Sequence, residues 1–115
     1  MGTTPLLTAL KNPDTGQAYQ DVYNALGRAY WDASDLQSKD LIHSAQETIY
    51  EIITELDQQQ LDANTAAFTQ LTAKIGAVNK ALKQIQDDIS KITKNISTAS
   101  TVLAAIGKVL SILPL

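Results

Sequence analysis

Residues 68–113 read FTQLTAKIGAVNKALKQIQDDISKITKNISTASTVLAAIGKVLSIL and hold the longest apolar repeat of this 115-residue chain. Fourteen positions in this stretch, here called the seam, alternate spacings of three and four residues, and all are apolar: Phe68, Leu71, Ile75, Val78, Leu82, Ile85, Ile89, Ile92, Ile96, Ala99, Leu103, Ile106, Leu110 and Leu113. In a chain that is 44% apolar, chance produces such a run about once in 10⁵ trials. The spacing predicts one long helix over residues 64–112, about 70 Å from end to end.

The first half of the chain predicts three shorter helices. A short helix over residues 5–11 begins at Pro5 and stops at Asn12-Pro13, and a second helix spans residues 16–32. Near Asp32–Asp40 the apolar stripe slips by one residue, and Ser34 with Gln37 has the spacing of a capping box. A third helix is therefore expected over residues 35–60, although a continuous bent helix is an alternative.

The polar stretch 57–64 is the expected point of chain reversal, and a fold near residues 61–63 pairs the seam with apolar residues of the first half. The pairs include Phe68 with Leu56, Leu71 with Ile53, Ile75 with Ile49, Leu82 with Ile42, Ile89 with Leu36, Ile92 with Ala33, Ile96 with Ala29, Ala99 with Leu26 and Leu103 with Val22. The same fold brings Asp40 near Lys83, Asp35 near Lys91 and Asp32 near Lys94. The predicted fold is all-α: one domain over residues 1–115, built as a long antiparallel, coiled-coil-like helical hairpin with a short N-terminal helix.

The charges are distributed unevenly along the chain. Residues 1–64 carry ten acidic and three basic side chains, whereas residues 65–115 carry two acidic and six basic ones. Opposite signs suggest that the two halves face each other. The net charge of −3 argues against a nucleic-acid partner, because nucleic-acid binders usually have a clear basic excess.

The composition excludes several kinds of site and signal. The absence of cysteine excludes disulfides and thiolate metal sites. Residues 1–12 have no long apolar core behind a basic start, so we expect no secretory signal peptide.

A two-helix hairpin buries too little apolar surface to be stable by itself. We therefore expect it to complete a helical bundle with a second copy of the chain or with another helical protein. Alanines on the flanks of the long helix allow a second helix layer to approach closely: Ala66, Ala67, Ala73, Ala77 and Ala81.

The candidate catalytic and metal-binding residues are few. His43, Glu47, Glu51 and Glu55 are spaced by four residues, but bundle metal sites need Glu-x-x-His pairs on facing helices, and this chain has a single histidine. The facing segment offers Lys74, Lys80 and Lys83 instead. No nucleophile motif is present. We expect no metal, no cofactor and no enzyme activity.

Two regions are candidates for contact with a partner or a membrane. Trp31 either caps the kink near Ser34 or is an exposed anchor for a partner; we favour the cap. Residues 99–115 are mostly apolar, and the seam there is widened by three off-seam residues, Val102, Val109 and Ile112. The candidate surface comprises Trp31, Val102, Leu103, Ile106, Val109, Leu110, Ile112 and Leu113.

Three explanations account for the widened stripe. The first short helix covers this end through Leu6, Leu7 and Leu10; or the stripe fills a groove of a partner protein; or it meets a membrane. We favour the first. The expected function is a non-enzymatic structural or interaction module, and the alternative is a membrane-active protein, such as a pore-forming or secretion-associated component, that acts through residues 99–115.

Overall fold

The computed structural model describes residues 5–57 and 66–113, with side chains from Thr8 onward. These residues form five helices and no strand: α1 (Pro5–Lys11), α2 (Pro13–Asp32), α3 (Leu36–Asp57), α4 (Ala66–Ile92) and α5 (Ile96–Ile112). The all-α fold class is confirmed. The expected reversal near residues 61–63 and the ends of the two helices that flank it lie outside the described residues.

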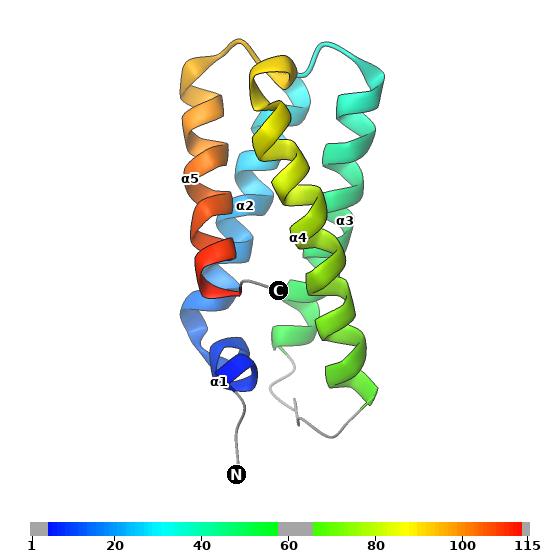
Figure 1. Ribbon diagram of the computed structural model, residues 1–115, viewed down its shortest axis with the longest axis vertical. Coiled ribbons are helices and arrows are strands. Elements are labelled where there is room, and N and C mark those ends of the chain that lie inside the picture. Colours follow the sequence, from blue (N-terminus) through cyan, green and yellow to red (C-terminus); the bar gives the residue numbers. More distant parts are fainter. Residues whose placement is uncertain (1–4, 58–65, 114–115) are drawn as a thin grey trace.

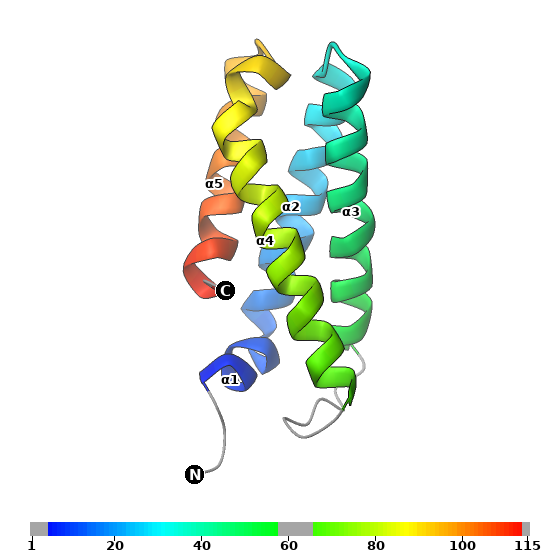
Figure 2. The ribbon, with the colours of Figure 1, turned by 45° about the vertical axis from the view of Figure 1, so that its right-hand side comes forward.

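The long helices α2 to α5 run up and down side by side, so the chain forms a four-helix bundle (Figure 1). α2 packs against α3 and α5, and α4 packs against the same two helices. The short α1 packs against the start of α2 at the base of the bundle (Figure 2). The molecule measures 47 × 21 × 20 Å.

The prediction of one continuous helix over residues 64–112 is wrong. α4 ends at Ile92 and α5 begins at Ile96, so the chain turns back on itself within three residues. A straight 70 Å helix would also exceed the 47 Å length of the bundle. Asn95 makes the break: its backbone is extended (φ −79°, ψ 109°) and its side chain accepts a hydrogen bond from the Thr98 N–H. That is the geometry of a helix N-cap.

Asp32, at the end of α2, holds this turn in place. Its Oδ2 atom accepts hydrogen bonds from the Thr98 hydroxyl at 2.7 Å and from the Thr93 hydroxyl at 3.5 Å. Thr93 Oγ1 in turn accepts the Asn95 N–H at 3.0 Å. The two bonds to Asp32 join residues more than sixty positions apart, so local sequence patterns do not reveal them.

The turn between α2 and α3 is also three residues long. Ala33 has extended backbone angles (φ −67°, ψ 135°), which end α2 without a glycine or proline. Asp35 caps α3 by accepting the Ser38 N–H at 2.6 Å and the Ser38 hydroxyl at 3.1 Å. The cap expected from Ser34 and Gln37 is therefore replaced by one shifted along by a single residue.

α2 begins at Pro13, three residues before the expected start. The Asn12 side chain accepts the Asp14 N–H, and Pro13 occupies the first helical position, where its missing N–H is not needed. The Asn12-Pro13 pair ends α1 and at the same time caps α2. The Thr15 hydroxyl donates to the Ala9 carbonyl and fixes α1 on this corner.

Most seam residues of α4 are buried, whereas only some of those of α5 are. In α4, every seam residue from Leu71 to Ile92 is buried. In α5 the buried side chains are Thr98, Val102, Ile106, Val109 and, at the C-cap, Leu113. Ile96 and Leu103, which belong to the seam, are 82% and 38% exposed. The short turn therefore rotates α5 by about one residue relative to the phase of α4.

Two helix contacts of the expected hairpin are present, α3 with α4 and α2 with α5, but they occur within a four-helix bundle and the register of the second contact differs. α3 and α4 are antiparallel neighbours, and Lys74 on α4 reaches Glu55 and Glu51 on α3, at 2.7 and 3.8 Å. α2 and α5 are antiparallel as well, yet Asp32 meets Thr98, about one helical turn from the expected register. The charge pairs expected for Asp32, Asp35 and Asp40 are not among the ion pairs of the described residues.

We predict that Asp32→Ala destabilises the bundle by about 1–3 kcal/mol, because two hydroxyls lose a charged acceptor. Denaturant unfolding followed by circular dichroism measures this effect. The matched control is Asp21→Ala on the same helix, where the carboxylate only accepts from Gln17 at the surface, and we expect it to change stability by about 0.5 kcal/mol or less. Equal effects of the two substitutions would refute this role of Asp32.

Candidate interaction surface

Three large apolar side chains lie exposed at the end of the bundle that carries both short turns. Trp31 closes α2, Leu36 opens α3 and Ile96 opens α5, and they are 79%, 74% and 82% exposed. Figure 1 shows the two turns side by side at the top of the bundle. We call Trp31, Leu36 and Ile96 the apolar end. Three such side chains lie at the same end of the bundle, so the apolar end is the leading candidate for a contact surface.

Trp31 is not a buried cap over the kink. Its ring stands edge-on against Tyr30, with centroids 5.6 Å apart and planes at 88°. The Lys39 ammonium lies 5.0 Å from the centroid of Tyr30 and 5.9 Å from that of Trp31. These contacts orient the indole but leave most of it uncovered, so the expected cap is wrong and Trp31 is exposed.

Charged groups of both signs surround the apolar end. On the α2–α3 side lies Asp35, and hydrogen bonds from the backbone N–H and the hydroxyl of Ser38 lower the pKa of its carboxyl. Lys91 lies at the end of α4 and Lys94 in the α4–α5 turn, and Lys91 lines the same surface groove as Asp35. Acidic and basic groups are therefore interspersed around this end.

The other predicted surface residues lie mainly inside the bundle. Val102, Ile106, Val109 and Leu113 are at most 1% exposed, so they form core rather than surface. Leu110 and Ile112 are half-buried, and Leu103 is 38% exposed. The physical reason is the rotation of α5, which turns the off-seam valines towards α2 and α4.

α5 is covered chiefly by α2 and α4 rather than by α1. Leu10 of α1 is buried in the core, whereas the side chains of Leu6 and Leu7 lie outside the described residues. The widened stripe is explained by packing between two helices of the bundle. The Asn79 amide on α4 also donates to the Leu113 carbonyl at 2.8 Å and anchors the end of α5.

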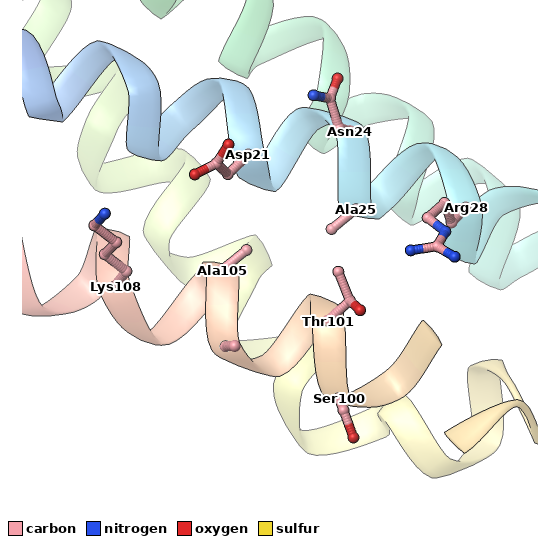
Figure 3. A pocket seen from close by; sticks show the side chains of 9 residues that line it. Asp21, Asn24, Ala25, Arg28, Ser100, Thr101, Ala105 and Lys108 are labelled. Atoms are coloured by element: carbon pink, nitrogen blue, oxygen red, sulfur yellow. The ribbon is translucent and has the colours of Figure 1, made fainter. Parts of the chain in front are cut away.

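A shallow groove of about 640 Å³ runs between α2 and α5 (Figure 3). Its floor consists of small side chains, including Ala25 and Ala105, and its edges carry Asp21, Arg28 and Lys108. The mixed charges and the open shape do not define a ligand. No buried polar side chain among the lining residues points to a specific molecule.

His43 and Glu47 form an exposed i, i+4 pair with Nε2 and Oε1 2.7 Å apart. They line an open groove of about 590 Å³ with Tyr23, Gln46, Tyr50 and Glu51. Glu51 and Glu55 turn instead to Lys74, and hydrogen bonding to Glu55 raises the lysine pKa. Lys74 thus complements these acids as the sequence suggests. Within the described residues, no three histidine or acidic side chains gather where a metal ion could bind.

No protein-family model, curated protein or solved structure matches this chain. No helix formed by the described residues has the length and apolar character needed to cross a membrane. Functional inference therefore depends on the geometry of the bundle itself.

We predict that Val102→Ala destabilises the protein more than Leu103→Ala does. Val102 is fully buried, so its truncation removes two buried methyl groups and is expected to cost about 2 kcal/mol. Leu103 is partly exposed, and its truncation is expected to cost about 1 kcal/mol or less. Chemical unfolding of the two variants measures the difference. If α5 buried the seam residues as one straight helix would, Leu103→Ala would cost more stability than Val102→Ala. That result would contradict the rotation of α5.

Tyr19 provides a prediction about pH. Its ring is fully buried, its hydroxyl has no hydrogen-bond partner in the described part of the chain, and burial raises its pKa well above 10.0. The unfolded chain therefore releases this proton at lower pH than the folded protein, so the contribution of Tyr19 makes stability fall as pH rises past 10. We expect Tyr19→Phe to be neutral or stabilising at pH 7 and to lose less stability than the wild type above pH 10. Urea unfolding as a function of pH measures both effects, and identical alkaline slopes for the two proteins would contradict the prediction.

Proposed function

We propose that this chain is a non-enzymatic helical interaction module that associates with copies of itself through the apolar end. The observation that carries the proposal is the exposure of Trp31, Leu36 and Ile96 at one end of an otherwise closed bundle. Exposed apolar patches on small proteins often mark contact surfaces, and aromatic side chains are frequent anchors in them.

The charges around the apolar end are compatible with a second copy as the partner. Asp35 and Lys91 lie close together there, and Lys94 lies in the neighbouring turn, so two copies can approach without facing surfaces of a single charge sign. A different helical protein with the same charge pattern is the other possible partner.

The chemistry of the side chains supports a non-enzymatic role. The single histidine is exposed and paired with Glu47. Its groove contains no serine, threonine or lysine side chain that it could activate as a nucleophile. Tyr19 is sealed in the core, where no substrate reaches its hydroxyl.

A membrane-active role is the second candidate. It is favoured by one feature of α5: Lys108 is its only charged residue, and Leu103 is exposed on its surface. To contact lipid through its apolar stripe, α5 would have to leave the bundle and release Val102, Ile106 and Val109. Dye release from lipid vesicles, lost on Leu103→Asp, would support this role.

We predict that the triple substitution Trp31→Ala, Leu36→Ser and Ile96→Ser weakens association by about tenfold or more, since burying even one such side chain is worth about 1.5–3 kcal/mol. Sedimentation velocity over a range of concentrations measures the change. The matched control is Tyr50→Ser, which removes an exposed aromatic ring from the middle of α3 and should leave association unchanged. A wild-type chain that stays monomeric at all concentrations would contradict the proposal.

A further inference from the structure

A rigid contact between two apolar ends is small. The bundle has a cross-section of 21 × 20 Å, so such a contact buries about 400 Å² on each copy, half of the 800 Å² that is typical of stable complexes. Strong self-association therefore needs more surface than the apolar end provides while the bundle stays closed.

α5 carries two overlapping apolar stripes, and the closed bundle uses only one. The stripe that faces the core comprises Thr98, Val102, Ile106, Val109 and Leu113. The other is the seam, which continues the heptad of α4 across the turn and comprises Ile96, Ala99, Leu103, Ile106, Leu110 and Leu113. If α5 packed only in the closed bundle, its apolar residues would not need to continue the heptad of α4, because the turn separates the two helices. The second stripe therefore suggests a state in which α4 and α5 form one helix.

The two turns are suited to straightening together. Both lie at the same end, both are three residues long, and neither contains glycine or proline. If both became helical, α2 with α3 and α4 with α5 would form two continuous helices of about 70 Å. Leu36 and Ile96, exposed at the helix ends of the closed bundle, would then lie within the two continuous helices.

We infer that the chain self-associates by exchanging halves between two copies. The α2–α5 pair of one copy swings away from its own α3–α4 pair and packs against the α3–α4 pair of a second copy. The surfaces that separate within each chain are the same ones that meet between chains, so most native contacts are conserved. This inference rests on the proposed function, because it specifies how the self-association takes place.

The energy difference between the two states is concentrated at the turns. Opening gives up the caps at Asp35 and Asn95 and the bonds that Asp32 accepts from Thr93 and Thr98. It gains helical hydrogen bonds in the turns and covers Leu36 and Ile96. Variants that weaken the caps should therefore favour exchange, and variants that oppose a continuous helix should prevent it.

Cross-linking distinguishes exchange from a rigid end-to-end contact. The chain has no cysteine, so introduced pairs are unique. Gly27→Cys with Gln46→Cys spans α2 and α3, since a Cβ at Gly27 lies 3.5 Å from Gln46 Nε2. The matched control, Asp21→Cys with Lys108→Cys, spans the groove between α2 and α5 (Figure 3). α2 and α5 of the same chain remain neighbours in both the closed and the exchanged state.

After refolding at high protein concentration, the dimer is isolated and treated with a short bismaleimide cross-linker. Exchange predicts that the 27–46 pair joins two chains, whereas the 21–108 pair joins residues of one chain. A dimer in which the 27–46 pair closes within one chain overturns exchange and leaves the proposed function intact. Absence of any dimer, both for the wild type and for a variant that lacks both caps (Asp35→Ala with Asn95→Ala), overturns exchange and the proposed function together.

Turn variants provide an independent measurement. Asp35→Ala with Asn95→Ala removes both caps and should raise the dimerisation constant by about tenfold or more, whereas a rigid end contact would not be strengthened. Leu36→Pro with Ile96→Pro should abolish the dimer, because proline fits the first position of a helix but breaks a continuous one. Leu36→Ala with Ile96→Ala removes similar apolar surface without breaking the helix. Equal dimer fractions for the proline and alanine pairs would overturn exchange.

Discussion

The carboxylate of Asp32 connects the two halves of the sequence. Asp32 is the last residue of α2, and it accepts hydrogen bonds from Thr93 and Thr98 in the second half of the chain. Thr93 lies in the turn that separates α4 from α5, and Thr98 lies in the first helical turn of α5. Because the turn is held there, α5 folds back beside α2 and the chain closes its own bundle instead of extending as a hairpin.

The closed bundle accounts for the burial pattern of α5. A three-residue turn changes the phase of the helix, so Val102 and Val109 face the core while Ile96 and Leu103 lose their cover. Most of the apolar residues of α5 that suggested a membrane or partner surface therefore pack in the core of the bundle. The large apolar side chains with the greatest exposure are Trp31, Leu36 and Ile96, which lie at the turn end of the bundle.

Both proposals arise from the same competition between two ways of burying the seam. Within a single chain, the caps at Asp35 and Asn95 favour two short helices over one long helix. Between two chains, straightening would cover the residues that the turns leave exposed. The balance is set by a few hydrogen bonds at one end of the bundle, each typically worth about 1 kcal/mol. Small changes at these turns are therefore expected to have large effects on assembly.

The sequence alone determined the helical class and the buried face of α4. These features depend on local periodicity, which is strong from Leu71 to Ile92. The sequence also placed Lys74, Lys80 and Lys83 opposite the acidic segment, and the structure shows that Lys74 is the one that pairs with Glu51 and Glu55. The break at Thr93–Asn95 was not evident, because no glycine or proline marks it and the heptad continues through it. Its cap does have a local signal, an asparagine three residues before Thr98, but the bonds to Asp32 exist only after folding. The tertiary structure alone decided which stripe of α5 is buried and which large side chains stay exposed, because burial depends on how four helices close around one another.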